Sequence, residues 1–408
     1  MRRTILACSI GLLVAATLTP TNGIAEARIV PPVRDLGEQA GLPTAVPSYA
    51  VHARDVDGDG WGDLLFVHHG GPTQLLRNTG NGFEIWNTFV HTPQGKGDRH
   101  DCSWGDVDRD ALLDLYCVKG AQRGLGEKRN ELWMQQPDGT FIDRAGAYRV
   151  IDPWGRGRRT AFIDLNGDPF PDLFVGNMAP RQDEHRSPNR TFVNKGGRRF
   201  REVRLGLTRE VGTFCVQVAD VDRDGRDDVL LCESRRLRLY LRRSGGFVDA
   251  SRAFGVRERR AVWARLARLD GDRGLDLAVV MRHRLSVRLG SPTGRFTPPV
   301  LRRRLALGQG LAIGDIDGRR GRDLLIVQGC KDGANVDDLL LLNDGNGSGW
   351  MQHPLPGGVA GCGDVAAALD FDRDRRKDFV VMNGSGQGGP ATSGPDQLLT
   401  MGDWFPSP

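Results

Sequence analysis

The chain has 408 residues, of which 55 are glycine and 26% are charged, with a net charge of +5. Glycine stands at about twice its usual share, which suits a chain that turns every few residues and argues against a fold built from long helices. The small positive charge is compatible with an acidic polysaccharide partner. It does not indicate nucleic acid, because interleaved basic and aromatic stacking motifs are missing.

The first 27 residues have the pattern of a secretory signal peptide. Two arginines precede an apolar stretch, residues 5–18, and a small-residue cleavage site, Ala25-Glu26-Ala27. We expect a secreted protein that begins at Arg28, and association with the cell envelope remains open. A lipoprotein signal around Cys8 fits less well, because most of the apolar region follows that cysteine. No second apolar run of membrane length follows.

An acidic nine-residue signature recurs seven times in the rest of the chain. The first copy is DVDGDGWGD at residues 55–63, and the others begin at residues 106, 164, 220, 268, 315 and 370. An unbroken apolar run follows each copy, which indicates a strand covered on both faces. A repeat of about 50 residues accommodates four short strands. Residues 28–408 are therefore predicted to be a single all-β domain, a seven-bladed β-propeller with four-stranded blades.

The last repeat stops after its third predicted strand, residues 397–400, so its fourth strand must come from elsewhere. Residues 33–42 match the fourth-strand segment 247–256, with Asp35 on Asp249 and Gly41 on Gly255. We therefore expect the start of the mature chain to complete the seventh blade and close the ring, which pairs strand edges that would otherwise be exposed.

Six cysteines follow the predicted signal peptide, and export permits them to pair. Cys102 and Cys117 stand four residues before and eleven after Asp106, and Cys215 and Cys232 stand five before and twelve after Asp220. The offsets add to the same value, as they do for residues that face each other across one hairpin. This predicts the pairs Cys102–Cys117 and Cys215–Cys232. The remaining pair, Cys330–Cys362, would join the sixth and seventh blades.

The acidic signature places carboxylates at positions one, three, five and nine, and a glycine at position six in its parent form. Such a loop converges hard oxygen atoms on one point, which is the ligand chemistry of calcium rather than zinc, and carboxylates this close repel one another without an ion. We expect about five calcium sites. The candidate ligands are Asp55, Asp57, Asp59, Asp63, Asp106, Asp108, Asp110, Asp114, Asp164, Asn166, Asp168, Asp172, Asp220, Asp222, Asp224, Asp228, Asp370, Asp372, Asp374 and Asp378.

The fifth and sixth copies depart from this pattern. In the fifth, Arg268 occupies position one and Arg273 replaces the turn glycine; in the sixth, Arg319 occupies position five. A guanidinium at these places could neutralise the remaining carboxylates instead of an ion. The prediction is that the fifth blade binds no calcium and that the sixth binds it weakly or not at all.

The acidic loops, in phase with a strand repeat, resemble the FG-GAP or VCBS repeat family, to which the integrin α-subunit heads belong. Fourth-strand segments such as Phe141-Ile142-Asp143-Arg144-Ala145 are also similar to the cartilage-acidic-protein-like group. The resemblance implies a seven-bladed propeller with calcium loops on one face, used for adhesion or ligand binding, with the loop aspartates as ligands. It carries over no catalytic residues.

The face opposite the acidic loops is the predicted binding surface, because loops there are long in the second, third, sixth and seventh blades. The partner would be an extracellular protein or polysaccharide, and we expect a monomer. Candidate residues are His68, His69, Trp154, Arg156, Arg158, Arg181, His185 and Arg186.

The alternative function is a carbohydrate-active enzyme such as a polysaccharide lyase on a calcium-stabilised propeller. In such an enzyme His100 with Arg99, or His185 with Arg186, could supply the base and the group that neutralises the substrate carboxylate. The sequence does not decide whether the chain is an enzyme. It favours a binding module, because it contains no nucleophile motif and no catalytic zinc spacing.

Overall fold

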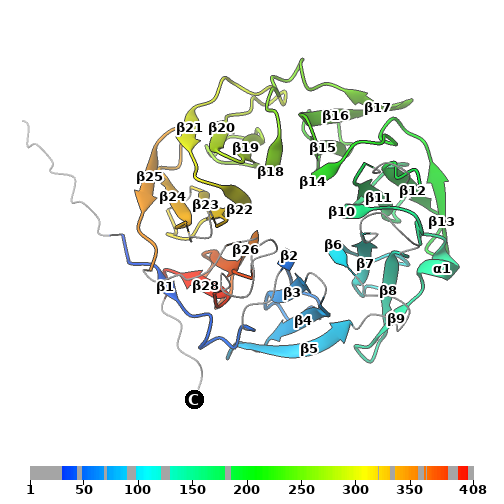
Figure 1. The fold of residues 1–408 in the computed structure, drawn as a ribbon, viewed down its shortest axis with the longest axis horizontal. Helices are drawn as coiled ribbons and strands as arrows, with labels where there is room; N and C mark the ends of the chain where they lie inside the picture. The colour runs from blue at the N-terminus through cyan, green and yellow to red at the C-terminus, as the bar shows by residue number, and fades with distance from the viewer. Residues whose placement is uncertain are drawn as a thin grey trace, which may run out of the picture. The chain divides into compact units, whose positions relative to one another are not determined.

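The computed structural model describes residues 30–43, 48–68, 71–89, 98–120, 129–179, 185–319, 321–330, 336–356, 363, 365–384 and 394–402. The unit that begins at Pro32 contains all the described strands. These strands form seven antiparallel sheets of four strands, which stand as blades in a ring (Figure 1). The predicted seven-bladed all-β propeller is confirmed.

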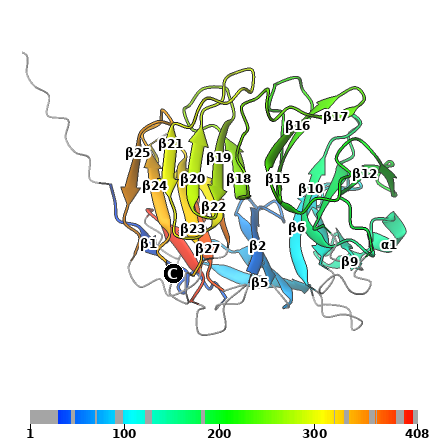
Figure 2. The same cartoon turned by 45° about the horizontal axis from the view of Figure 1, so that its top comes forward.

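Each blade runs from an innermost first strand to an outermost fourth strand (Figures 1 and 2). The first three blades contain β2 (Ser48–Arg54), β3 (Asp63–His68), β4 (Thr73–Asn78) and β5 (Phe83–Phe89); β6 (Arg99–Gly105), β7 (Asp114–Lys119), β8 (Glu131–Gln135) and β9 (Phe141–Asp143); and β10 (Gly157–Ile163), β11 (Asp172–Asn177), β12 (Arg190–Asn194) and β13 (Phe200–Val203). A single-turn helix, α1 (Ala145–Tyr148), follows β9.

The other four blades repeat this order. They contain β14 (Thr213–Ala219), β15 (Asp228–Glu233), β16 (Leu237–Arg243) and β17 (Gly246–Asp249); β18 (Ala261–Ala267), β19 (Asp276–Met281), β20 (Arg284–Arg288) and β21 (Leu301–Arg304); β22 (Gly308–Gly314), β23 (Asp323–Gln328), β24 (Leu339–Asn343) and β25 (Trp350–His353); and β26 (Val365–Leu369), β27 (Asp378–Met382), β28 (Gln397–Thr400) and β1 (Arg34–Asp35).

The second strand of every blade is buried along its whole length, as its unbroken apolar sequence predicts. The neighbouring blades cover both faces of each of these strands, and the side chains between the blades form the hydrophobic core. One continuous core cluster, for example, contains Leu64 of the first blade, Val380 of the seventh and Ile326 of the sixth. The core therefore lies between blades, so no blade buries its apolar face alone.

The N-terminal segment closes the ring as predicted. β1 pairs with β28 in antiparallel register, with Asp35 opposite Leu399. Asp35 accepts hydrogen bonds from the Gly37 N–H (3.0 Å) and from the Gln397 side chain (2.8 Å). The next residues turn so that Gly41 adopts φ 75°, and a Cβ there would lie 2.9 Å from the Phe83 carbonyl oxygen. Gly255 adopts φ 82° against Phe296 in the same way, which explains the match between the two segments.

Two of the predicted disulfides are confirmed. Cys102 pairs with Cys117 between β6 and β7, and Cys215 pairs with Cys232 between β14 and β15, in each case directly opposite in the register. Cys330 is also disulfide-bonded, but its predicted partner Cys362 lies outside the described residues. Disulfides of this kind are typical of an extracellular environment. Among the described helices, none has the length and apolarity that a membrane crossing requires.

Asp396, just before β28, is a buried carboxyl that titrates far from its usual range. Asp396 accepts a hydrogen bond from the Asn383 N–H (2.9 Å) at Oδ1, whereas its Oδ2 has no hydrogen-bond partner among the described residues. Burial raises its pKa to about 7. The folded state therefore holds this proton to a higher pH than the unfolded chain does, and stability is lost as pH rises from about 4 to about 7.

The variant Asp396→Asn should lack this pH dependence, because its amide does not titrate. The unfolding free energy of the wild type relative to the variant should fall by up to about 1.4 kcal/mol per pH unit between pH 4 and 7. Denaturant unfolding of both proteins at a series of pH values measures the difference, in which all shared titrations cancel. Parallel curves for the two proteins would contradict the prediction.

Candidate metal centres and binding surfaces

The seven acidic loops join the first strand to the second strand of each blade, so all of them lie at the same end of the blades. The position-nine aspartate begins the second strand. Its Oδ2 accepts the N–H of loop position two in every blade, at 2.5 to 2.9 Å. In the first six blades its Oδ1 accepts an N–H at the end of the third strand, at 2.7 to 3.0 Å.

The position-nine carboxyl therefore connects the loop to the third strand in the first six blades, including the two altered loops. Asp276 does so in the fifth blade, where position one is arginine. From the sequence, the position-nine aspartate is predicted only as a metal ligand. Its presence in all seven copies, including the two altered ones, was the available signal for a structural role.

Burial raises the pKa of every position-nine carboxyl, and neighbouring loop aspartates act in the same direction, against the backbone N–H donors. The pKa is about 6 for Asp63, Asp172, Asp228 and Asp276, and about 7 for Asp114, Asp323 and Asp378. Nearby positive charge would favour the ionised form of these groups.

Carboxylates of five loops come together closely enough to share an ion. One ligand oxygen from each of three aspartates lies within 4.8 Å of the others. The groups are Asp55, Asp57 and Asp63; Asp106, Asp108 and Asp114; Asp220, Asp222 and Asp228; Asp315, Asp317 and Asp323; and Asp370, Asp372 and Asp374. All the ligand atoms are hard oxygens, which fits calcium and does not favour zinc.

The other predicted ligands lie outside these groups. In the first, second and fourth blades these are the position-five aspartates, Asp59, Asp110 and Asp224, and in the seventh blade it is Asp378. In the third blade the Asn166 amide donates to Asp168 (2.8 Å), and Asp164 accepts the Gly167 N–H (2.6 Å).

The two altered loops differ from each other. In the fifth blade Asp270, Asp272 and Asp276 do not form such a group among the described residues. The exposed Arg268 makes no ion pair with any described residue, so it does not neutralise them as suggested. In the sixth blade Arg319 lies 3.5 Å from Asp317 and supplies a positive charge within the cluster.

The predicted binding surface is only partly exposed. Trp154 is 40% exposed and stacks on the exposed His185, with ring centroids 4.0 Å apart. Arg186 is exposed and pairs with Glu210 (3.0 Å). In contrast, His68 and Arg156 are buried, so these two predictions are wrong for a surface role.

His68 contacts the Ser48 hydroxyl and the Gln74 side chain, both at 3.1 Å. Arg156 donates to the Ala179 carbonyl oxygen. Arg158 is half-buried with its guanidinium 5.5 Å from the Tyr49 ring centroid. His69 and Arg181 lie outside the described residues.

The first candidate pair for lyase chemistry is buried. Arg99 is fully buried and donates to Glu131 Oε2 (2.6 Å), and His100 contacts the Gly157 carbonyl oxygen (2.6 Å) and Asp98 (2.9 Å). Burial lowers the pKa of His100, which disfavours its charged form. Both side chains are occupied by structural contacts and neither faces an open substrate site.

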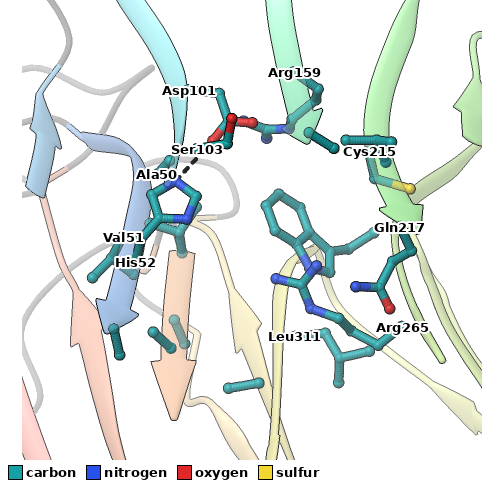
Figure 3. Close-up of a pocket in the computed structure, with 18 of the residues that line it drawn as sticks. Ala50, Val51, His52, Asp101, Ser103, Arg159, Cys215, Gln217, Arg265 and Leu311 are labelled. Carbon is teal, nitrogen blue, oxygen red and sulfur yellow. Dashed lines mark hydrogen bonds and ion pairs between the residues drawn. The ribbon is translucent and has the colours of Figure 1, made fainter. Parts of the chain in front are cut away.

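The structure also shows an axial cavity that the sequence reasoning missed. Its volume is about 540 Å³, and the innermost strands of all seven blades line it. Its polar side chains include His52, Asp101, Arg159, Gln217 and Arg265 (Figure 3). They stand three or five residues before an acidic loop, and alignment of the repeats on their loops would have brought these positions together.

A model of the FG-GAP-like repeat matches residues 55–117, 164–231 and 220–279. Each match begins at an acidic loop, and the matches fall within a ring of seven four-stranded blades. The chain belongs to the FG-GAP repeat family. Within this FG-GAP propeller, the matched stretches include the acidic clusters of the first, second and fourth blades.

Solved structures share the fold of this FG-GAP propeller. An Agrocybe aegerita lectin that recognises non-reducing terminal N-acetylglucosamine is 17% identical, with a TM-score of 0.50 over 76% of this chain and 80% of the lectin. BBS1N in complex with ARL6DN is 12% identical, with a TM-score of 0.51 over 88% of this chain and 94% of that one. No curated protein matches the sequence. The FG-GAP propeller fold is consistent with a binding module.

Proposed function

We propose that this chain is an exported, calcium-stabilised propeller that binds an extracellular protein or carbohydrate partner, with residues 28–408 as its single mature domain. The observation that carries the proposal is the set of aspartate clusters in the loops of the first, second, fourth and seventh blades, all at one end of the blades. Calcium bound there would offset the repulsion between carboxylates and fix the loops. Its predicted ligands are the four aspartates of each intact loop, and Asn166 with Asp164, Asp168 and Asp172 in the third blade.

The opposite end of the blades is the proposed partner surface, and Trp154 with His185 forms its centre. Trp154 precedes β10 and His185 lies between β11 and β12, so both stand at the end of the third blade away from its acidic loop. Two buried contacts hold the loops that carry Trp154 and His185. Buried Asp152 pairs with Arg190 (2.6 Å), and the Ser187 hydroxyl accepts the Arg156 N–H (2.8 Å).

A partner that binds this exposed aromatic pair would cost little conformational entropy, because the loops that carry the pair are already held in place. Among proteins of this fold, the lectin recognises a sugar and BBS1N binds a protein. Both classes of partner are therefore reasonable for the Trp154 surface, and a screen should cover both.

The Trp154→Ala variant should weaken partner binding about tenfold or more, as expected when a central aromatic contact is lost. A glycan array and a pull-down from the extracellular fraction, each with and without chelator, supply the partner, and titration calorimetry measures its affinity. Trp61→Ala is the matched control, because Trp61 lies in the acidic loop of the first blade, beneath Arg373. Full binding by Trp154→Ala together with lost binding by Trp61→Ala would place the surface at the other end of the propeller.

A further inference from the structure

The axial cavity has an uneven lining. On the innermost strands, the polar side chains of the lining come from the first five blades, and the equivalent positions of the sixth and seventh blades carry Ala312 and Ala367. Arg322, from the acidic loop of the sixth blade, also lines the cavity. The two small alanines leave open space opposite the polar groups. The volume of about 540 Å³ lies within the usual range of small-molecule sites, roughly 300–1,000 Å³.

Two guanidinium groups meet in this cavity. Arg159 of β10 and Arg265 of β18 lie 4.7 and 5.0 Å from the ring centroid of the same tryptophan, Trp263. Arg159 is held in place, because it donates to the carbonyl oxygens of Phe214 (2.7 Å) and His100 (3.2 Å). Arg265 is different, since it makes no hydrogen bond or ion pair with any residue that the structure describes.

The nearby carboxylate does not compensate both cations. Asp101 contacts His52 Nε2 with Oδ1 (2.9 Å) and accepts the Thr160 N–H with Oδ2 (3.1 Å). Burial and the charge of Arg159 lower the pKa of Arg265 to about 10, with only a partial opposing effect of Asp101. Arg265 is half-buried and lines the open cavity, so its positive charge is available to an anion that enters there.

Other groups around Arg265 suit an organic ligand. Gln217 accepts the Leu266 N–H with its side-chain oxygen (2.8 Å), which leaves its amide N–H groups as donors. Figure 3 shows Arg265, Gln217 and His52 around the same open space. Leu311 and the alanines provide apolar surface on the remaining side.

We propose that the axial cavity binds a small organic anion, of the size of a sugar acid, whose carboxylate or sulfate group pairs with Arg265. Gln217 donates a further hydrogen bond to the ligand, and Trp263 with Arg159 forms the fixed wall behind Arg265. This site lies on the innermost strands, so the proposal is independent of calcium in the loops and of the Trp154 surface.

Titration calorimetry of the calcium-saturated protein with D-glucuronate tests the proposal, with D-glucose as the neutral probe and inorganic sulfate as the simple ion. We expect glucuronate to bind, glucose not to bind, and Arg265→Gln to weaken glucuronate binding at least tenfold. Arg304→Gln is the matched control, because Arg304 lies exposed on the outermost strand of the same blade; it should bind like the wild type. Tryptophan fluorescence should change on binding, because Trp263 lines the site.

Thermal unfolding separates a binding role of Arg265 from a structural one. Arg265 has no described hydrogen-bond partner and is repelled by Arg159, so Arg265→Gln should unfold at the same temperature as the wild type or above it. A lower midpoint would show that the arginine serves the packing of Trp263, and would overturn the proposal. Absent glucuronate binding, binding unaffected by Arg265→Gln, or sulfate bound as tightly as glucuronate would also overturn it.

Discussion

Removal of calcium with a chelator is expected to lower the thermal unfolding midpoint of the propeller by about 10 °C or more. A ligand at a hundred times its dissociation constant adds about 2.7 kcal/mol per site to the stability of the folded state. Four or five sites of this kind would contribute on the order of 10 kcal/mol, and each kcal/mol is worth roughly 2 °C even in larger domains. Calorimetric scans in calcium, in magnesium and in chelator measure the effect.

Position-three variants test whether the effect comes from the proposed loops. Asp108→Asn in the second blade should reduce the calcium-dependent stabilisation, whereas Asp270→Asn in the fifth blade should leave it unchanged, because only Asp108 belongs to an aspartate cluster. Native mass spectrometry should count about five calcium ions. Seven tightly bound ions would contradict the predictions for the fifth and sixth blades, and equal effects of the two variants would contradict the loop assignment.

The Glu131→Gln variant is expected to lose about 3–5 kcal/mol of unfolding free energy, because it leaves a buried cation uncompensated. Glu131 on β8 pairs with Arg99 through Oε2 (2.6 Å) and with Lys119 through Oε1. Although burial alone raises the pKa of Glu131, the charges of Arg99 and Lys119 outweigh it and hold the pKa below its usual range. Denaturant unfolding at neutral pH measures the loss.

Glu202→Gln is the matched control for this variant. Glu202 pairs with Arg190 at the surface (2.9 Å), and an exposed ion pair contributes only about 0–1 kcal/mol. Equal losses for the two variants would show that burial does not decide the strength of the Glu131 network. A Glu131→Gln loss below about 1 kcal/mol would show that Arg99 finds another acceptor.

Much of the scaffold could be predicted from the sequence because it depends on repetition. The acidic loops mark the same hairpin in every blade, so the positions of Cys102 and Cys117 relative to the loop were enough to place them opposite each other. The same reasoning matched Asp35 with Asp249 and predicted the closing strand. Each of these inferences concerns residues that are close along one hairpin or equivalent between repeats.

The site was harder to predict because burial and convergence depend on neighbouring blades. His68 and Arg156 stand in or beside loops, yet other side chains cover them. Arg159 and Arg265 are 106 residues apart in the sequence, and only the closed ring brings both to the ring of Trp263. A pattern within one repeat contains no information about which side chains meet at the axis.

In three blades, an asparagine at the end of the third strand links its own blade to the preceding one. Asn78 donates its amide to Phe371 O in the loop of the seventh blade (3.0 Å), and Asn194 and Asn343 contact Val107 O (2.9 Å) and Leu269 O (2.6 Å) of the preceding blades. Each of these asparagines also donates its N–H to the position-nine carboxyl of its own blade. Local unfolding of an acidic loop in one blade would therefore remove a hydrogen bond that holds the next blade. We expect the ring to unfold as one cooperative unit and not one blade at a time.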